Sequence, residues 1–200
     1  MIDLLAFGFV IGLTGAVVPG PMLFATIEAS LRKGWIAGPE IVLGHAAIEI
    51  MICAVIFFGF SIANDMIFQT VSLVGGGALI AFGIATVNSS KNATFDMDKN
   101  ITSNPVIAGA LTSVSNPYFL IWWLTIGNTL VMDGLRISFV AAVLFVVGHW
   151  IADITWYAAI SISSSKGRKV MSDRVYGRVL SACGLFLISF GLYYVVKIFV

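Results

Sequence analysis

The sequence predicts an all-α membrane protein with six transmembrane helices, in two inverted three-helix repeats whose first and fourth helices are broken. Of the 200 residues, 59% are hydrophobic and 10% are charged, whereas soluble domains carry about 25% charged residues. A helix needs about 20 apolar residues to cross the hydrocarbon core of a bilayer. Six stretches are long enough for this: Leu4–Leu31, Trp35–Ala63, Phe68–Val87, Val106–Met132, Leu135–Ser163 and Val179–Phe199.

The basic residues predict how these helices are oriented. Of the 11 Lys and Arg residues, Arg136 and Lys197 fall on one side of the predicted membrane and the rest fall on the other. Because cytoplasmic loops carry an excess of Lys and Arg, we expect a cell-membrane protein with both its N-terminus and its C-terminus outside. The predicted cytoplasmic residues are Arg32, Lys33, Lys91, Lys99, Lys166, Arg168, Lys169, Arg174 and Arg178.

The composition argues against several classes of function. A net charge of +1 provides no basic surface for nucleic acid, so no nucleic-acid partner is expected. Cys53 and Cys183 lie far apart in apolar stretches and form no CxxC pair, so we expect both to be small buried hydrophobic residues. No motif that pairs a nucleophile with a base is recognisable. We therefore expect neither enzymatic activity nor a cofactor.

The second half of the chain resembles the first. The segment from Gly44 to Ile50, which contains His45 and Glu49, matches the segment from Gly148 to Ile154, which contains both His149 and Asp153. Because each repeat contains an odd number of spans, the second must insert upside down, as is common in secondary transporters. We expect one transmembrane transport domain over residues 1–200, with repeat one at 4–88, a cytoplasmic linker at 89–104 and repeat two at 105–200. Two further matches pair residues 13–19 with 111–117 and residues 76–83 with 184–191.

Proline motifs interrupt the first and fourth predicted spans. Pro19-Gly20-Pro21 must break or kink the first helix, and Asn116-Pro117 in the fourth can cap and restart a half-helix. In the predicted topology, the positive N-terminal ends of both half-helices converge near the midplane and favour an anion or a carboxylate. The alternative is a pair of packing kinks. The predicted substrate-binding residues are Thr14, Pro19, Gly20, Pro21, Asn116 and Pro117.

Two pairs of ionisable residues lie within the predicted membrane spans. His45 and Glu49, and likewise His149 and Asp153, are four residues apart and so share one face of a helix. Charged residues at this depth are costly and are retained where they are paired or functional. Histidine exchanges protons near neutral pH, so we predict proton coupling at these four positions. Two alternatives remain: each pair satisfies itself and only orients its helix, or all four bind a divalent metal.

Small residues mark one face of the first span. Gly8, Gly12 and Gly15 permit another helix to approach closely. The pattern leaves open whether that partner is another span or a second copy of the chain, so a homo-oligomer is one of two interpretations.

Several of these motifs resemble the LysE/RhtB family of amino-acid exporters. The segment from Gly15 to Pro21, the segment from Ser30 to Gly34, then Gly38 and Gly44-His45 look like the N-terminal signature of that family. Ser115-Asn116-Pro117 resembles the Asn-Pro motif of its fourth span, and the resemblance covers nearly the whole chain. It implies export of amino acids or close relatives, driven by an ion gradient.

The resemblance does not determine the cargo. Pro39-Glu40 is more acidic than the family pattern at the start of the second helix, and the wider superfamily includes divalent-metal exporters and thiol-redox electron carriers. A redox role is disfavoured because Cys53 and Cys183 are not at equivalent positions in the two repeats. We therefore expect an ion-coupled amino-acid exporter whose partners are its substrate, a coupling ion and the bilayer, with a metal-cation exporter as the alternative.

Overall fold

The computed structural model describes residues 2–57, 65–90, 104–168 and 170–198, and every regular element in these ranges is a helix. This confirms the predicted all-α class. The elements in chain order are α1 (Ile2–Ala16), α2 (Pro21–Lys33), α3 (Ala37–Phe57), α4 (Asp65–Ser90), α5 (Pro105–Val114), α6 (Pro117–Trp122), the π-helix η2 (Trp123–Gly127), α7 (Asn128–Ile137), α8 (Phe139–Arg168) and α9 (Asp173–Val196).

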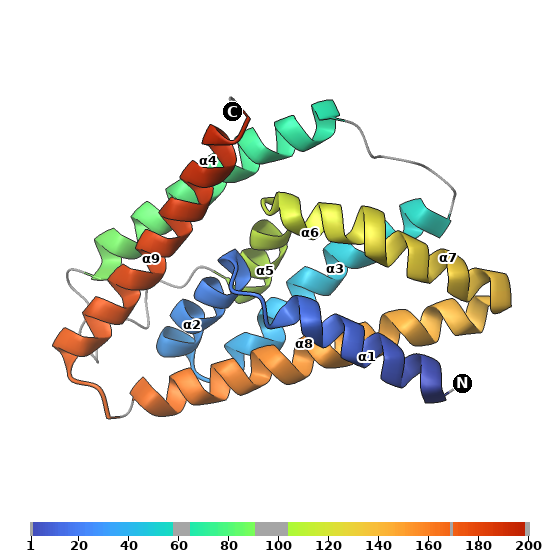
Figure 1. Ribbon diagram of the computed structural model, residues 1–200. Helices are drawn as coiled ribbons and strands as arrows, with labels where there is room; N and C mark the ends of the chain where they lie inside the picture. Colours follow the sequence, from blue (N-terminus) through green and yellow to red (C-terminus); the bar gives the residue numbers. More distant parts are fainter. Residues whose placement is uncertain (1, 58–64, 91–103, 169, 199–200) are drawn as a thin grey trace.

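Three helix pairs organise the molecule. Helices α4 and α9 run antiparallel and side by side along one flank (Figure 1). Helix α1 packs along α8, and α3 packs along α5. Helix α2 lies between these groups, because it contacts α3, α5, α8 and α9.

The first predicted span is broken where its prolines stand. Helices α1 and α2 meet at an angle of 84°. Helix α2 starts at Pro21 after the extended residue Gly20, because proline fits the first turn of a helix, where its missing N–H is not needed. The fourth predicted span is interrupted as well: α5 ends at Val114 and α6 begins at Pro117, after Asn116 as its N-cap.

Length and hydropathy identify fewer complete spans than the six predicted. Helices α3, α8 and α9 are each long and apolar enough to cross a membrane, and the bent pair of α1 and α2 makes a fourth. The breaks explain part of the difference. The fourth predicted span is divided into α5, a short apolar helix of 10 residues, and the separate elements α6, η2 and α7 that follow it. The described apolar part of α4, Ser72–Asn88, is likewise shorter than a full span.

Several boundaries differ from the predicted ones because of helix caps. Helix α9 begins at Asp173 instead of Val179, since the Ser172 side chain accepts a hydrogen bond from the Val175 amide and caps the helix. Helix α4 continues to Ser90, inside the predicted linker, and Asn104 caps α5 by accepting from the Val106 amide. Residues 91–103 of the linker lie outside the described residues.

Glycines permit the close approach within each helix pair. A β-carbon at Gly8 would overlap the carbonyl of Phe145 in α8, and one at Gly12 would lie 2.9 Å from the Cα of His149. For these two glycines, the partner of the small-residue face is therefore another helix of the same chain. Equivalent contacts join α3 to α5 through Gly44 and Gly109.

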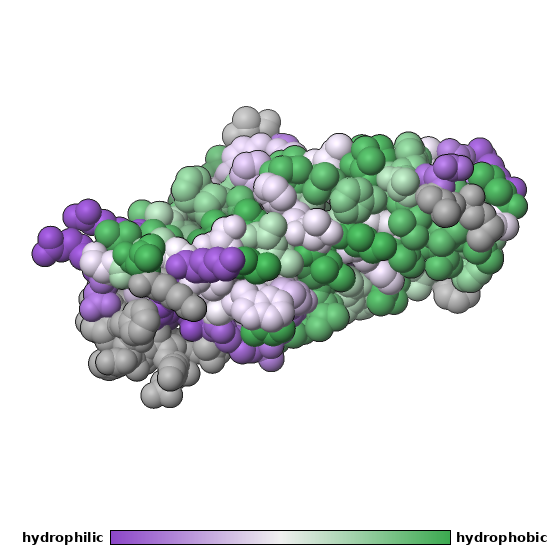
Figure 2. Space-filling model, turned by 90° about the horizontal axis from the view of Figure 1, so that it is seen from below, coloured by the Kyte–Doolittle hydropathy of each residue, from purple (hydrophilic) through white to green (hydrophobic). Residues whose placement is uncertain are grey.

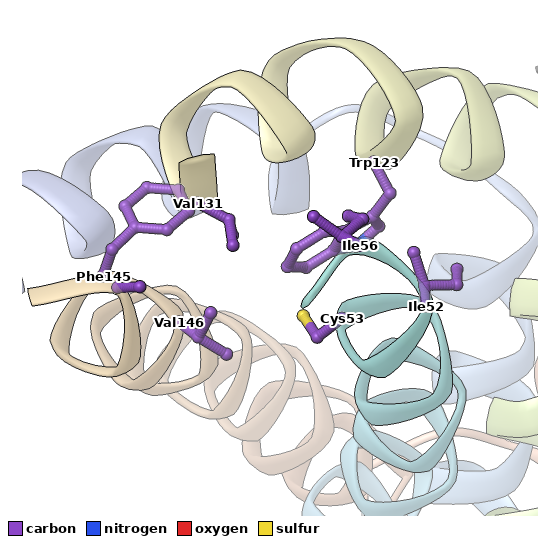
Figure 3. Close-up of a cluster of buried hydrophobic side chains, with 8 residues drawn as sticks. Ile52, Cys53, Ile56, Trp123, Val131, Phe145 and Val146 are labelled. Atoms are coloured by element: carbon purple, nitrogen blue, oxygen red, sulfur yellow. The ribbon is translucent and has the colours of Figure 1, made fainter. Parts of the chain in front are cut away.

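Apolar side chains fill the interior and also cover the outside. One buried cluster joins α3, η2, α7 and α8 (Figure 3); its members are Ile52, Cys53, Ile56, Trp123, Val131, Ala142, Phe145 and Val146. Hydrophobic residues also cover most of the face drawn in Figure 2, with hydrophilic residues mainly toward its two ends. Leu43, Met51 and Phe139 are 64–65% exposed. Such an outer surface fits lipid as the surrounding solvent.

Candidate functional site

Four ionisable side chains meet in the interior, and we call them the buried tetrad: His45 and Glu49 from α3, and His149 and Asp153 from α8. Each is at most 8% exposed, and one ligand atom from each lies within 4.8 Å of those from the others. Within each helix the spacing of four residues points both side chains the same way. The structure thus brings together all four residues predicted for proton coupling.

Glu49 lies at the centre of the tetrad and is fully buried. Its Oε1 accepts hydrogen bonds from Trp123 Nε1 at 2.9 Å and from His149 Nε2 at 3.1 Å. The Nε2 atom of His45 lies 3.0 Å from the same oxygen. A carboxylate with three donors on one oxygen is well suited to stay ionised in a low-dielectric interior.

Asp153 has fewer partners than Glu49. Its Oδ2 lies 3.4 Å from His149 Nε2 and 3.8 Å from His45 Nε2, but it accepts no hydrogen bond although Asp153 is only 2% exposed. A buried carboxylate oxygen without a hydrogen bond favours an added proton or a cationic group. Glu49 Oε2 and His149 Nδ1 are likewise buried without a hydrogen-bond partner, so three of the four tetrad members have an open bonding position, and Asp153 has it on the oxygen nearest both histidines.

Ser113 of α5 links His45 to the backbone. Its Oγ lies 2.6 Å from His45 Nδ1 and 2.7 Å from the carbonyl oxygen of Gly109. A hydroxyl donates one hydrogen. The Ser113 hydroxyl therefore donates either to the Gly109 carbonyl or to His45 Nδ1, and in the first case it accepts from His45 Nδ1.

The tetrad forms one wall of a cavity of about 510 Å³. Pro19, Gly20 and Asn116 of the helix breaks line the same cavity. Thr14 is absent from the lining; its Oγ1 donates to the carbonyl of Ile11 at 2.7 Å. Pro21 and Pro117 begin their helices behind the lining. Of the predicted substrate-binding residues, the structure therefore places three on the cavity wall and three outside it.

The two helix breaks lie next to each other at the wall of this cavity. A β-carbon at Gly20 would lie 4.0 Å from Asn116 Nδ2. Asn116 Oδ1 accepts from the Tyr118 amide at 3.0 Å and from the Tyr194 hydroxyl at 2.9 Å. The N-terminus of α6 is thus already capped, while α2 has no side-chain cap. Pro21 has no N–H and the Leu23 amide donates to the Gly20 carbonyl at 3.1 Å, so the remaining donors for an anionic group at α2 are those of the other first-turn amides.

Several cavity residues were not predicted as site residues. Trp122 and Trp123 flank the start of η2, and a π-helix shifts the side-chain direction of the residues around it. Trp122, Trp123, Ser113 and Tyr194 all line the cavity. The only signal for the tryptophans in the sequence is their depth inside an apolar span, which is too far from either membrane surface for an interfacial anchor.

The tetrad also has the donors for a divalent transition metal, since imidazole and carboxylate are suitable ligands for such ions. The geometry is thus compatible with both cargo classes that the sequence left open.

Comparison with known proteins bears on this choice. A model of the family described as "LysE type translocator" matches residues 13–197. The chain is also similar to the "Putative amino acid efflux protein YcgF" of Bacillus subtilis (strain 168), with 25% identity over 198 residues, 92% of this chain and 91% of the relative. No solved structure matched the chain.

Proposed function

Since the chain belongs to the LysE type translocator family, we propose that it exports amino acids or close derivatives across the cell membrane in exchange for protons. The observation that carries this proposal is the juxtaposition of the buried tetrad and the two helix breaks on one cavity. A cavity of this kind offers an amino acid a carboxylate for its ammonium group and backbone donors for its carboxylate. The relative whose name refers to amino acid efflux supports the same cargo.

In this proposal, substrate and proton compete for the tetrad. The Asp153 oxygen that accepts no hydrogen bond can take either a proton or a substrate ammonium group, but not both at once. Binding of the ammonium group then favours release of a proton, and protonation favours release of the amino acid. Reciprocal coupling of two ligands at one site is what antiport requires.

The proposed architecture is six spans in two inverted repeats, and reciprocal glycine contacts support it. A β-carbon placed on Gly76 of α4 would lie 2.7 Å from the carbonyl oxygen of Gly191 in α9. A β-carbon placed on Gly184 of α9 would likewise lie 2.7 Å from the carbonyl oxygen of Gly83 in α4. A two-fold axis that exchanges Gly76 with Gly184 and Gly83 with Gly191 converts one contact into the other. Such an axis in the membrane plane gives the cavity two equivalent routes, one to each side.

The proposed orientation has both termini outside, supported by the nine basic residues that fall on the opposite side.

A divalent metal cation is the second candidate cargo. The observation that favours it is the ligand set of the tetrad, with two imidazoles and two carboxylates within 4.8 Å. In that case the substrate would bind to side chains only, and the helix breaks would have no ligand.

Counterflow in proteoliposomes separates the two cargoes. Vesicles that contain the full chain are loaded with one unlabelled amino acid or one metal, and entry of the same labelled species is followed at equal pH on both sides. We expect exchange of at least one amino acid and none of Zn²⁺, Co²⁺ or Cd²⁺. Exchange of a metal and of no amino acid would replace the first proposal with the second.

A further inference from the structure

The cavity wall between the tetrad and the helix breaks is rich in aromatic side chains. From this wall we infer that the protein selects amino acids with a large, uncharged, apolar side chain, such as phenylalanine or leucine, over small, acidic and basic ones. The inference rests on the proposed export function and specifies its substrate class.

Four aromatic side chains lie on this wall, two beside the histidines of the tetrad and two on α9 toward the helix breaks. The rings of Phe119 and Trp122 lie 5.0 and 4.9 Å from the histidine rings of the tetrad. On α9, the ring of Phe190 lies 6.2 Å from that of Tyr194, whose hydroxyl bonds to Asn116 at the break. All four aromatic residues line the cavity. An apolar substrate side chain placed among them would leave water and gain contact with ring faces and edges.

The polar ends of the cavity cannot distinguish one amino acid from another. The Asp153 oxygen without a hydrogen bond suits an ammonium group, and the Asn116 amide beside the uncapped start of α2 suits a carboxylate. All amino acids have these two groups. Selection must therefore come from the wall between them.

Acidic side chains lack a partner on this wall. The described lining residues include no Lys or Arg, while Glu49 and Asp153 already contribute two carboxyl groups. A third carboxylate, on the substrate side chain, would be desolvated without a counter-ion and would face like charge.

Basic side chains lack a second site. Both cavity carboxylates belong to the tetrad, whose ligand atoms lie within 4.8 Å of one another, so they provide one position for a cation. Lysine and arginine carry two cationic groups separated by the length of the side chain. The second cation would lie against aromatic rings, and a cation–π contact does not replace the lost hydration as a carboxylate would.

Small side chains leave the wall uncovered. The cavity of about 510 Å³ is within the size range of pockets that enclose drug-sized ligands. Each additional methylene buried there is worth roughly a fourfold gain in affinity. Alanine, which buries only one methyl group, is therefore expected to bind more weakly than leucine or phenylalanine.

Counterflow by the full chain in proteoliposomes tests this selectivity. Labelled phenylalanine, leucine, alanine, lysine and glutamate are each measured at equal pH across the membrane. We expect a KM for phenylalanine or leucine at least about tenfold lower than for the other three. Trp122→Ala and Phe190→Ala should raise the KM for phenylalanine by about tenfold and leave that for alanine nearly unchanged. Trp35→Ala, at a 55% exposed position away from the cavity, serves as the matched control.

The outcomes separate this inference from the proposed function. A lower KM for alanine, lysine or glutamate than for phenylalanine and leucine would overturn the selectivity while leaving amino-acid export intact. Equal loss for all five amino acids in both folded variants would also overturn it, because the wall would then not select. Exchange of none of them by the folded protein would overturn export itself, and the selectivity with it.

Discussion

In the proposed mechanism, Glu49 supplies the negative charge at the centre of the tetrad, next to the Asp153 carboxylate that takes up the proton. One oxygen of the Glu49 carboxylate faces Trp123 and both histidines of the tetrad. Glu49→Gln keeps the shape and part of the hydrogen bonding but removes that negative charge. We expect transport driven by a pH gradient to fall at least about tenfold, while exchange at equal pH survives. Uptake per folded molecule, measured with and without the gradient, tests this.

Asp153→Asn provides the companion test. Normal gradient-driven transport in both Glu49→Gln and Asp153→Asn would remove the tetrad from the coupling mechanism. A purely structural tetrad predicts instead less folded protein, with unchanged transport per folded molecule. A metal exporter predicts weaker cation binding, with an effect that depends on the metal.

Asn116 has both a capping and a bridging role. Its side chain caps α6 through the Tyr118 amide and accepts from the Tyr194 hydroxyl. Asn116→Ala should lower the free energy of unfolding by about 0.5–2 kcal/mol from the cap alone, with a further loss from the tyrosine. Tyr194→Phe removes only the second bond and should cost about 0.5–1.5 kcal/mol. Thermal unfolding in detergent measures both, and an Asn116→Ala variant as stable as Tyr194→Phe would contradict the capping role.

The sequence predicted each half of the tetrad, His45 with Glu49 and His149 with Asp153, because a spacing of four residues places both side chains on one helix face. It could not predict Trp123 or Ser113, which approach the tetrad from positions 74 and 68 residues away. Thr14 was included because it precedes Pro19 as Thr112 precedes Pro117. Helix packing gives a different register, because Gly8 contacts α8 in the same way as Gly109 contacts α3. The segment from Gly8 to Pro19 is three residues longer than the segment from Gly109 to Pro117. By that register the counterpart of Thr112 is Ile11, so the place of Thr112 on the cavity wall does not carry over to Thr14.

At the scale of elements, neighbouring glycines of α4 offer a matched pair of substitutions. A β-carbon at Gly76 would lie 2.7 Å from the Gly191 carbonyl and 2.8 Å from a methyl group of Val195, whereas one at Gly77 would meet nothing within 4 Å. We expect Gly76→Ala to destabilise the protein by about 1–3 kcal/mol through overpacking. Gly77→Ala should be neutral or stabilising, because alanine favours the helix.

Unfolding midpoints of the two variants in the same detergent provide the comparison. Equal midpoints would mean that α4 and α9 do not pack closely in solution.

Hydropathy predicted where the helices lie, and proline chemistry predicted where two of them break. No residue pattern predicted η2, because a π-helix depends on the packing of its surroundings. Helix ends also differ by several residues where a cap such as Ser172 extends a helix beyond its apolar stretch.

At the scale of the whole molecule, the orientation is open to direct labelling. Single cysteines are introduced into a variant that lacks the buried Cys53 and Cys183. We expect a membrane-impermeant thiol reagent applied to cells to label positions 64–66 and 131–133, and not positions 88–104, because basic loops stay in the cytoplasm. Strong external labelling in 88–104 would reverse the proposed topology.

Exchange of amino acids for protons is the central claim, and one measurement tests it most directly. Proteoliposomes are loaded with phenylalanine and a pH-sensitive dye and are diluted into amino-acid-free buffer of the same pH, with the membrane potential clamped. Because amino acids and protons move in opposite directions, we expect the lumen to acidify as phenylalanine leaves, and protein-free vesicles to show neither change. Efflux of phenylalanine without a change in lumenal pH, or with alkalinisation, would contradict the account.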